Sequence, residues 1–178
     1  MKEPKIDFKN VKTFRGMEGY GINADLYING VKCYFIYDSG DGGELNFQDI
    51  IKGDITKIQF NKMLLDEYIK SLPKKKWNIG GKEKFYPVKL DDYINDKIVE
   101  WDEQRKKKAF KKKMQKLFNT CIVFGVPDSG TYQYLNYKKP LSSFPKPFLE
   151  NQIENVQKKY CNGDVQILNT NLQQLVAN

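Results

Sequence analysis

The chain has 178 residues, no histidine, and 30 Lys and Arg against 22 Asp and Glu, which gives a net charge of +8. A chain of this length is expected to form one globular unit with a buried core. The lack of histidine excludes Ser-His-Asp and Cys-His catalysis and histidine-metal sites, so any catalysis must use carboxylates, Lys, Tyr, Ser or Cys.

The sequence favours a cytoplasmic protein without a membrane partner. It has no run of about 18 apolar residues, and its start, "MKEPKIDFKN", lacks the apolar stretch of a signal peptide. Its three cysteines, Cys33, Cys121 and Cys161, form no CxxC pair. Neither a disulfide framework nor a zinc finger is therefore expected.

A β-hairpin is predicted over about 20–38, after a possible strand in "KNVKTFR" (9–15). Asn29-Gly30 is a strong signal for a two-residue turn, and alternating strands flank it. Continuous pairing from this turn predicts the register 26↔33, 24↔35 and 22↔37, with these residues on the core face.

Two glycine-rich stretches, "RGMEGYG" (15–21) and "DSGDGGE" (38–44), should meet at the far end of this hairpin, with Asp38 opposite Gly21. The second is not an EF-hand loop, because glycines occupy two of the ligand positions. A Mg²⁺ or Mn²⁺ site for phosphoester chemistry is one possibility. A partner-binding loop and plain turn chemistry are the others. The carboxylates that would form the metal or catalytic site are Asp38, Asp41 and Glu44, with Glu18 in support.

The next elements are a short amphipathic helix at 61–72 and the segment "KKKWNIGGKEKFYPVK" (74–89). In that segment lysines alternate with Trp77, Phe85 and Tyr86, a composition typical of surfaces that stack on single-stranded nucleic acid. A short hairpin around Gly80-Gly81 with its aromatics turned inward accounts for the same residues, and it is the interpretation we favour.

A long helix is predicted over about 90–118. Leu90, Ile94, Ile98 and Trp101 share one face, whereas Phe110, Met114, Leu117 and Phe118 cluster roughly opposite. The stretch between them, "DEQRKKK", has no apolar residue. We therefore expect a helix that crosses solvent between two docking surfaces or is kinked there.

The excess charge lies in one part of this helix. Residues 105–116, "RKKKAFKKKMQK", hold eight Lys or Arg and no acid, which leaves 22 bases against 22 acids elsewhere. Binding of nucleic acid or another polyanion is one interpretation, and a solvated face that complements the helix dipole is the other. The residues that would bind a polyanion are Arg105, Lys106, Lys107, Lys108, Lys111, Lys112, Lys113, Lys116 and, in the hairpin, Trp77.

Strands are then predicted at 120–126 and 130–138, a helix from about Pro147 to Asn162-Gly163, and a final strand in "DVQILN". The fold class is α+β, with an antiparallel sheet built on the hairpin at about 20–38 and packed with about three helices, one of them long and basic. We expect a single domain over 1–178, with 74–118 as a protruding basic hairpin and helix.

The stretches "FRGMEGYGINADLYINGVKCYFIYDSGDGGELNF" (14–47) and "VQILNTNL" (165–172) carry a resemblance. The chain resembles a group of small uncharacterised bacteriophage proteins with a G-x-E-G-x-G-x-N-A-x-L-Y run, an NG turn, a G-x-G-G loop and a terminal ILNTNL. The resemblance covers about a quarter of the chain. It implies no activity, only a setting in an infected bacterial cytoplasm, where small basic proteins bind nucleic acid, host enzymes or defence complexes.

Three functions follow as hypotheses. The first is a non-enzymatic phage-type protein, for host takeover or counter-defence, that engages nucleic acid, a nucleoprotein or an acidic host protein through the basic helix and needs no cofactor. The second is a metal-dependent nuclease or phosphoesterase that uses the carboxylates at the glycine-rich end. The third is a structural virion component.

Overall fold

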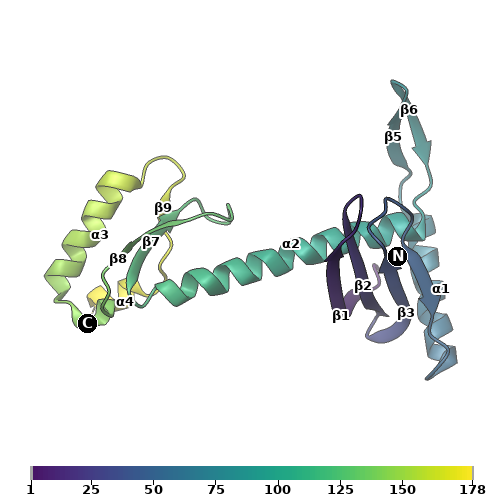
Figure 1. Ribbon diagram of the computed structural model, residues 1–178, viewed down its shortest axis with the longest axis horizontal. Helices are drawn as coiled ribbons and strands as arrows, with labels where there is room; N and C mark the ends of the chain where they lie inside the picture. Colours follow the sequence, from purple (N-terminus) through teal and green to yellow (C-terminus); the bar gives the residue numbers. More distant parts are fainter. Residues whose placement is uncertain (1, 178) are drawn as a thin grey trace. The chain divides into compact units, whose positions relative to one another are not determined.

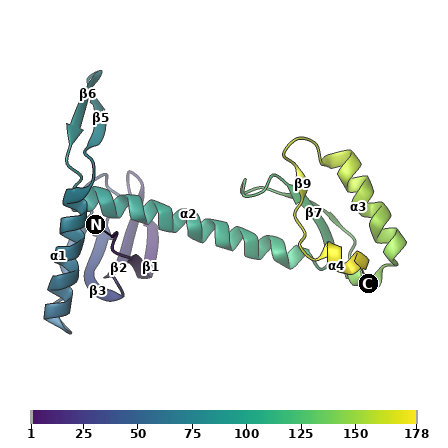
Figure 2. The same cartoon turned by 180° about the vertical axis from the view of Figure 1, so that it is seen from behind.

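The computed structural model describes residues 2–177, apart from the side chain of Ile79. The chain divides into two compact units, the first ending at Trp101 and the second beginning at Asp102. The sequence led us to expect one globular unit, and the division falls inside the long helix. The predicted α+β class is confirmed (Figure 1, and from behind in Figure 2).

Unit 1 is built on an antiparallel sheet of β1 (Ile6–Arg15), β2 (Tyr20–Ile28), β3 (Val31–Asp38) and β4 (Asn46–Asp49), which neighbour one another in this order. Strands β2 and β3 form the predicted hairpin around Asn29-Gly30, whose φ angles are both positive, as a type I′ turn requires. The later elements of unit 1 are α1 (Ile55–Ser71), β5 (Lys75–Ile79), β6 (Lys82–Tyr86) and the start of α2 (Leu90–Leu117).

The predicted register of this hairpin is wrong beyond its first pairs. A β-bulge leaves Cys33 without a partner of its own, so every later residue of β3 is shifted by one. The observed pairs are Ile28↔Val31, Tyr27↔Lys32, Leu26↔Tyr34, Asp25↔Phe35, Ala24↔Ile36, Asn23↔Tyr37 and Ile22↔Asp38.

Burial explains why the bulge is favourable. It places both Cys33 and Ile36 in the core with no exposed surface, whereas Tyr37, which continuous pairing would turn inward, is 42% exposed. The predicted core face of β2 is confirmed, because Ile22, Ala24, Leu26 and Ile28 are all buried. The alternation of apolar residues along β2 therefore predicts its buried face, whereas the bulge shifts the alignment of β3.

Helix α1 packs on the buried face of this sheet through Ile58, Leu65 and Ile69, and Ile94 of α2 joins the same cluster. The helix begins earlier than the predicted 61–72, because Asp54 caps it by accepting a hydrogen bond from the backbone N–H of Lys57 at 3.0 Å.

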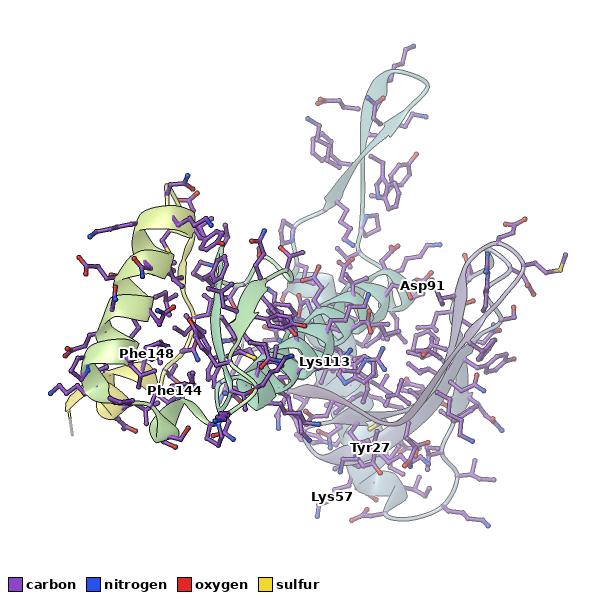
Figure 3. The ribbon with its side chains drawn as sticks, turned by 60° about the vertical axis from the view of Figure 1, so that its left-hand side comes forward. Tyr27, Lys57, Asp91, Lys113, Phe144 and Phe148 are labelled. Atoms are coloured by element: carbon purple, nitrogen blue, oxygen red, sulfur yellow. The ribbon has the colours of Figure 1, made fainter. Side chains whose placement is uncertain are left out.

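The predicted hairpin around Gly80-Gly81 is confirmed by β5 and β6, and both glycines have the positive φ of a type I′ turn. The expectation that its aromatics turn inward is wrong. Trp77 is 48% exposed, Phe85 59% and Tyr86 43%. Figure 3 draws the side chains of β5 and β6, which project from both faces of the hairpin.

Unit 2 holds an antiparallel sheet of β8 (Gln133–Asn136), β7 (Cys121–Gly125) and β9 (Gln166–Ile167), in which β7 is central. The two predicted strands before Pro147 and the helix that follows are confirmed. The final strand is shorter than "DVQILN", and a short C-terminal helix was not predicted. The helices of unit 2 after α2 are the 3-10 helix η1 (Leu141–Ser143), α3 (Lys146–Tyr160) and the C-terminal α4 (Leu172–Ala177).

The two faces of β7 belong to different clusters. Ile122 and Phe124 pack with α3, where the Phe124 and Tyr160 rings stack at 4.7 Å. Cys121 and Val123 pack on the other side with residues of α2. Figure 3 labels Phe144 and Phe148, whose rings stack 5.0 Å apart within this unit.

The predicted change of apolar face along α2 is confirmed within each unit. Leu90, Ile94 and Ile98 pack in the core of unit 1, whereas Met114 and Leu117 pack in unit 2. Within residues 2–177, no helix combines the length and apolar character needed to cross a membrane.

Candidate functional site

The two units differ strongly in charge. Unit 2 carries 13 Lys and Arg against six Asp and Glu, a net charge of +7, whereas unit 1 carries 17 against 16, a net charge of +1. An excess of this size within 77 residues creates a positive potential that attracts polyanions.

Most of this charge lies on the second half of α2, where all eight basic residues are exposed. Lys108, Lys112 and Lys116 recur every fourth residue, about 6 Å apart along the helix axis. At about 100° per residue they lie opposite Met114 and Leu117, the side chains that dock on the sheet. We call these three residues the lysine ridge.

Within residues 2–177, acidic residues pair with three of the eight basic side chains of this segment, those of Arg105, Lys106 and Lys111. The carboxylate of Asp102 accepts from Arg105 at 2.7 Å and from Lys106 at 2.6 Å. The hydrogen bond from Lys106, together with that from Arg105, holds the pKa of Asp102 below its usual value. Lys111 lies 3.7 Å from Asp128. Within residues 2–177, no ion pair engages Lys107, Lys108, Lys112, Lys113 or Lys116.

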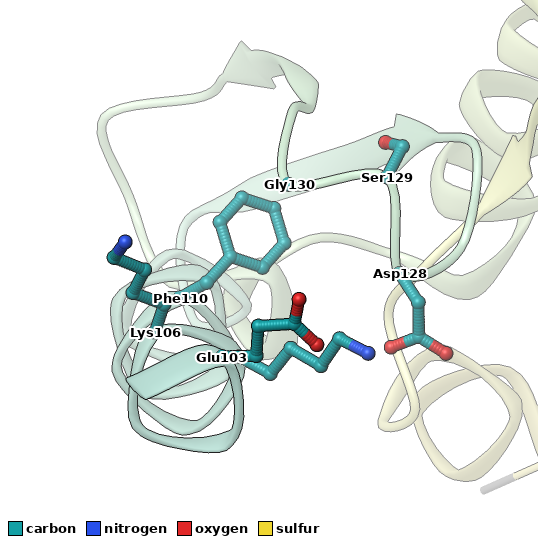
Figure 4. Close-up of a pocket in the computed structure, with 7 residues that line it drawn as sticks. Glu103, Lys106, Phe110, Asp128, Ser129 and Gly130 are labelled. Atoms are coloured by element: carbon teal, nitrogen blue, oxygen red, sulfur yellow. The ribbon is translucent and has the colours of Figure 1, made fainter. Parts of the chain in front are cut away.

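A pocket of about 320 Å³ lies beside the basic segment, between α2 and the β7–β8 loop. In Figure 4 the Phe110 ring is directed from α2 toward the loop segment that holds Ser129 and Gly130. The pocket contains Glu103 and Asp128 as well as two lysines, so its own charge is mixed. It does not select a ligand by charge.

Aromatic rings continue from this pocket onto the edge strand β8. Phe110 lies 5.2 Å from Tyr132, ring centre to ring centre, and Tyr132 lies 6.3 Å from Tyr134. Tyr134 is 49% exposed. Sequence reasoning missed this row, although the alternation of Tyr132 and Tyr134 on one face of a predicted strand was a visible signal.

The register of the β5–β6 hairpin sorts its side chains onto two faces. On one face Trp77 lies opposite Lys84 and Lys75 lies opposite Tyr86, with Lys82 beyond them. We call this the Trp77 face. The other face carries Lys76, Asn78, Glu83 and Phe85.

Glu83, the acidic residue of this hairpin, lies on the second face and pairs there with Lys76. On the Trp77 face, Lys75 bonds Asp96 of α2 at 2.6 Å. Within the described chain, Lys82 and Lys84 have no acidic partner. The Trp77 face therefore combines two exposed aromatic rings with two unpaired positive charges.

The two glycine-rich stretches meet, as predicted. The backbone N–H of Glu18 donates to Gly40 at 2.9 Å, and a Cβ on Gly42 would stand 2.5 Å from Glu18 Oε2. The predicted alignment of Asp38 with Gly21 is wrong, because the bulge at Cys33 sets Asp38 opposite Ile22.

The four carboxylates do not converge on a point. Asp38 accepts from the backbone N–H of Gly40 at 2.7 Å, which is turn chemistry. Asp41 is exposed, and Glu44 lies 3.9 Å from Lys89. Across residues 2–177, no group of three or more Cys, Asp or Glu side chains could hold a metal ion. The expected cluster of Glu18, Asp38, Asp41 and Glu44 is thus not formed.

Comparisons of the chain with models of protein families, with curated proteins and with solved structures give no match.

Proposed function

We propose that this chain is a nucleic-acid-binding protein whose second unit contacts the phosphate backbone through the lysine ridge. The observation that carries the proposal is the concentration of +7 in unit 2 together with the lack of acidic partners for Lys108, Lys112 and Lys116 within the described chain. Lysine contacts to phosphates release counterions, which gives affinity without sequence preference.

The packing of α2 supports this role. Met114 and Leu117 fix the helix on the sheet of unit 2, so the ridge is held on the opposite side by a rigid element. A solvated basic face would look similar in sequence. It would not require three unpaired lysines in one row, since Lys116 alone complements the negative end of the helix dipole.

The resemblance to small phage proteins supplies the proposed setting. In the cytoplasm of an infected cell, a chain of this kind would act by binding nucleic acid or nucleoprotein, as a host-takeover or counter-defence factor, rather than by catalysis.

The test compares two triple variants that lose the same charge. The ridge variant replaces Lys108, Lys112 and Lys116 by Gln. The control variant replaces Lys12, Lys52 and Lys57, three exposed lysines of unit 1, by Gln. Figure 3 labels Lys57. Within the described residues, none of these three has an acidic partner either. Gln keeps the helix propensity of Lys, so circular dichroism should be unchanged.

Binding is measured by fluorescence anisotropy with labelled single-stranded and duplex oligonucleotides over a series of salt concentrations. For single strands, log affinity falls linearly with log salt, and each phosphate contact contributes about −0.7 to the slope. The loss of three contacts in the ridge variant should therefore make this slope less steep by about 2. At low salt it should bind about tenfold more weakly than the wild type. The control variant should keep both values. Equal losses in the two variants, or no binding by the wild type at low salt, would overturn the proposal.

A further inference from the structure

We propose that the Trp77 face of the β5–β6 hairpin is a stacking platform for the unpaired bases of single-stranded nucleic acid. The inference rests on the proposed function for its class of ligand but on different residues, which lie in unit 1. It assigns a base-contacting surface to a chain whose lysine ridge would contact phosphates alone.

The exposure of the aromatic rings is the first support. An isolated two-stranded hairpin is marginally stable in water, and burying aromatic area is the usual way to stabilise one. Here Trp77 and Tyr86 are 48% and 43% exposed instead. Large aromatics on an exposed element are characteristic of binding surfaces.

The arrangement of these rings suits successive bases. Trp77 and Tyr86 are diagonal neighbours on one face, because Trp77 pairs with Lys84 and Tyr86 with Lys75. Diagonal neighbours in an antiparallel pair lie roughly 7–8 Å apart. Two flat rings at this spacing can each receive the face of one base, and every base has such a face.

The distribution of charge identifies a polyanion as the occupant. Lys82 and Lys84 share the face with the rings and have no acidic partner in the described chain, whereas Glu83 lies on the opposite face and is held by Lys76. A partner with an acidic apolar surface would match the charges too. The alternation of rings and lysines, however, follows the alternation of bases and phosphates in a single strand.

The hairpin provides its own control residue. Phe85 is 59% exposed, more than either ring of the Trp77 face, but it lies on the face that carries Glu83. A general contribution of exposed aromatic area to binding would involve Phe85 as much as Tyr86. If the platform lies on the Trp77 face, Tyr86 contributes to binding and Phe85 does not.

The first experiment uses the fluorescence of Trp77. The chain has two tryptophans, and Trp101 packs edge-on against Phe8 at 6.3 Å, so Trp101→Phe leaves Trp77 as the only tryptophan. Titration of this variant with a single-stranded homopyrimidine oligonucleotide should quench the Trp77 emission. The same sequence as a duplex should not. Absence of quenching at saturating single strand would overturn the inference.

The second experiment measures affinity. Tyr86→Ala should weaken single-strand binding about tenfold and leave duplex binding and the salt slope unchanged. Phe85→Ala should change single-strand affinity less than about twofold. Tyr86→Phe keeps an aromatic ring at this position and should bind single strands as tightly as the wild type does. Comparison with Tyr86→Ala shows whether binding requires the ring. An unchanged circular dichroism spectrum of Tyr86→Ala shows that the fold is kept. Equal effects of Tyr86→Ala and Phe85→Ala would contradict the platform.

The two proposals fail in different ways. If the ridge variant keeps full affinity and salt slope while Trp77 is still quenched, the proposed role of the ridge is wrong and the platform stands. If the ridge variant loses affinity as expected but Trp77 is not quenched and Tyr86→Ala binds normally, the platform is wrong and the proposed function stands.

Discussion

Gly16 and Gly40 lie so close together that a Cβ on Gly16 would stand 2.6 Å from the Cα of Gly40. The atoms in the way belong to the backbone of the 38–44 loop, which cannot move aside as a flexible side chain can. Gly16→Ala should therefore lower the free energy of unfolding by about 1–3 kcal/mol.

Gly19, which lies with Gly16 in the stretch 15–21, provides the control for this prediction. A Cβ there would meet nothing within 4 Å, and its φ is not in the left-handed region. Gly19→Ala should be neutral or stabilising by up to about 1 kcal/mol, because it restricts the unfolded chain. Chemical denaturation of both variants checks the pair, and a Gly16→Ala variant as stable as Gly19→Ala would show that the two loops are not packed together.

The second prediction concerns Asp25, a buried carboxylate that accepts from Lys32 and Asn10, each at 2.8 Å. Burial acts to raise the pKa of Asp25, but the hydrogen bonds from Lys32 and Asn10 outweigh it, so the pKa lies below its usual value. Asp25→Ala should lower the free energy of unfolding at neutral pH by about 1–3 kcal/mol.

The pH dependence of this effect has a definite sign. Because the pKa of Asp25 is lowered in the folded chain, its stabilisation is fully present above the unfolded value of about 3.9 and is lost as the pH falls through the folded value. The gap between wild type and Asp25→Ala should therefore close in acid. Asp7→Ala, which breaks an exposed pair with Lys5 in the same sheet, should cost at most about 1 kcal/mol. A gap that widens in acid would refute the assignment.

The third prediction concerns Asn169, in the ILNTNL run. Its side chain accepts from the backbone N–H of Val123 at 2.6 Å and donates to the carbonyl of Cys121 at 2.9 Å, thereby extending the pairing of β7 beyond the two residues of β9. Asn169→Leu would leave the N–H of the buried Val123 without a partner and should destabilise unit 2 by about 1–3 kcal/mol.

Asn155 is a suitable control, because it is exposed on α3 and bonds to Asn151. Asn155→Leu should change the free energy of unfolding by no more than about 0.5 kcal/mol. Thermal or urea unfolding, followed through amide signals of β7, distinguishes the two variants. Similar stabilities would mean that Asn169 does not hold the strand.

The fourth prediction is a gain of binding. Asp102 neutralises part of Arg105 and Lys106, so Asp102→Asn should raise affinity for nucleic acid about two- to threefold at low salt and steepen the salt dependence. Asp164→Asn removes the same charge elsewhere in unit 2 and reports the effect of net charge alone. Anisotropy titrations of the two variants should place Asp102→Asn above Asp164→Asn, and the reverse order would argue against binding at the basic segment.

The sequence predicted the elements that depend on local pattern. The turn at Asn29-Gly30, the core face of β2, the hairpin at Gly80-Gly81 and the change of apolar face along α2 all follow from spacing and turn chemistry. The bulge at Cys33 could not be predicted in the same way. It depends on which residues of β3 fit against α1, a contact between segments distant in sequence.

The candidate site was predictable only in part. The basic segment is visible in the sequence as a run of lysines. Which of its side chains pair with Asp102 or Asp128, and which have no acidic partner in the described chain, depends on side-chain geometry. The carboxylates near Gly40 were expected to converge because their loops meet. Their directions are set instead by local hydrogen bonds such as that of Asp38. The exposure of Trp77 contradicts the general tendency of aromatics to be buried.

The bulge gives β3 one residue more than its pairing with β2 requires. Deletion of Cys33 would leave Tyr34 opposite Leu26 and Ile36 opposite Ala24, as they are now, but would leave a cavity where the Cys33 side chain is buried. In a regular strand a one-residue deletion turns every following side chain to the other face. In this hairpin the deletion would instead turn the bulge into regular pairing, so Ile36 would keep its inward direction and the cost would be confined to the packing around position 33.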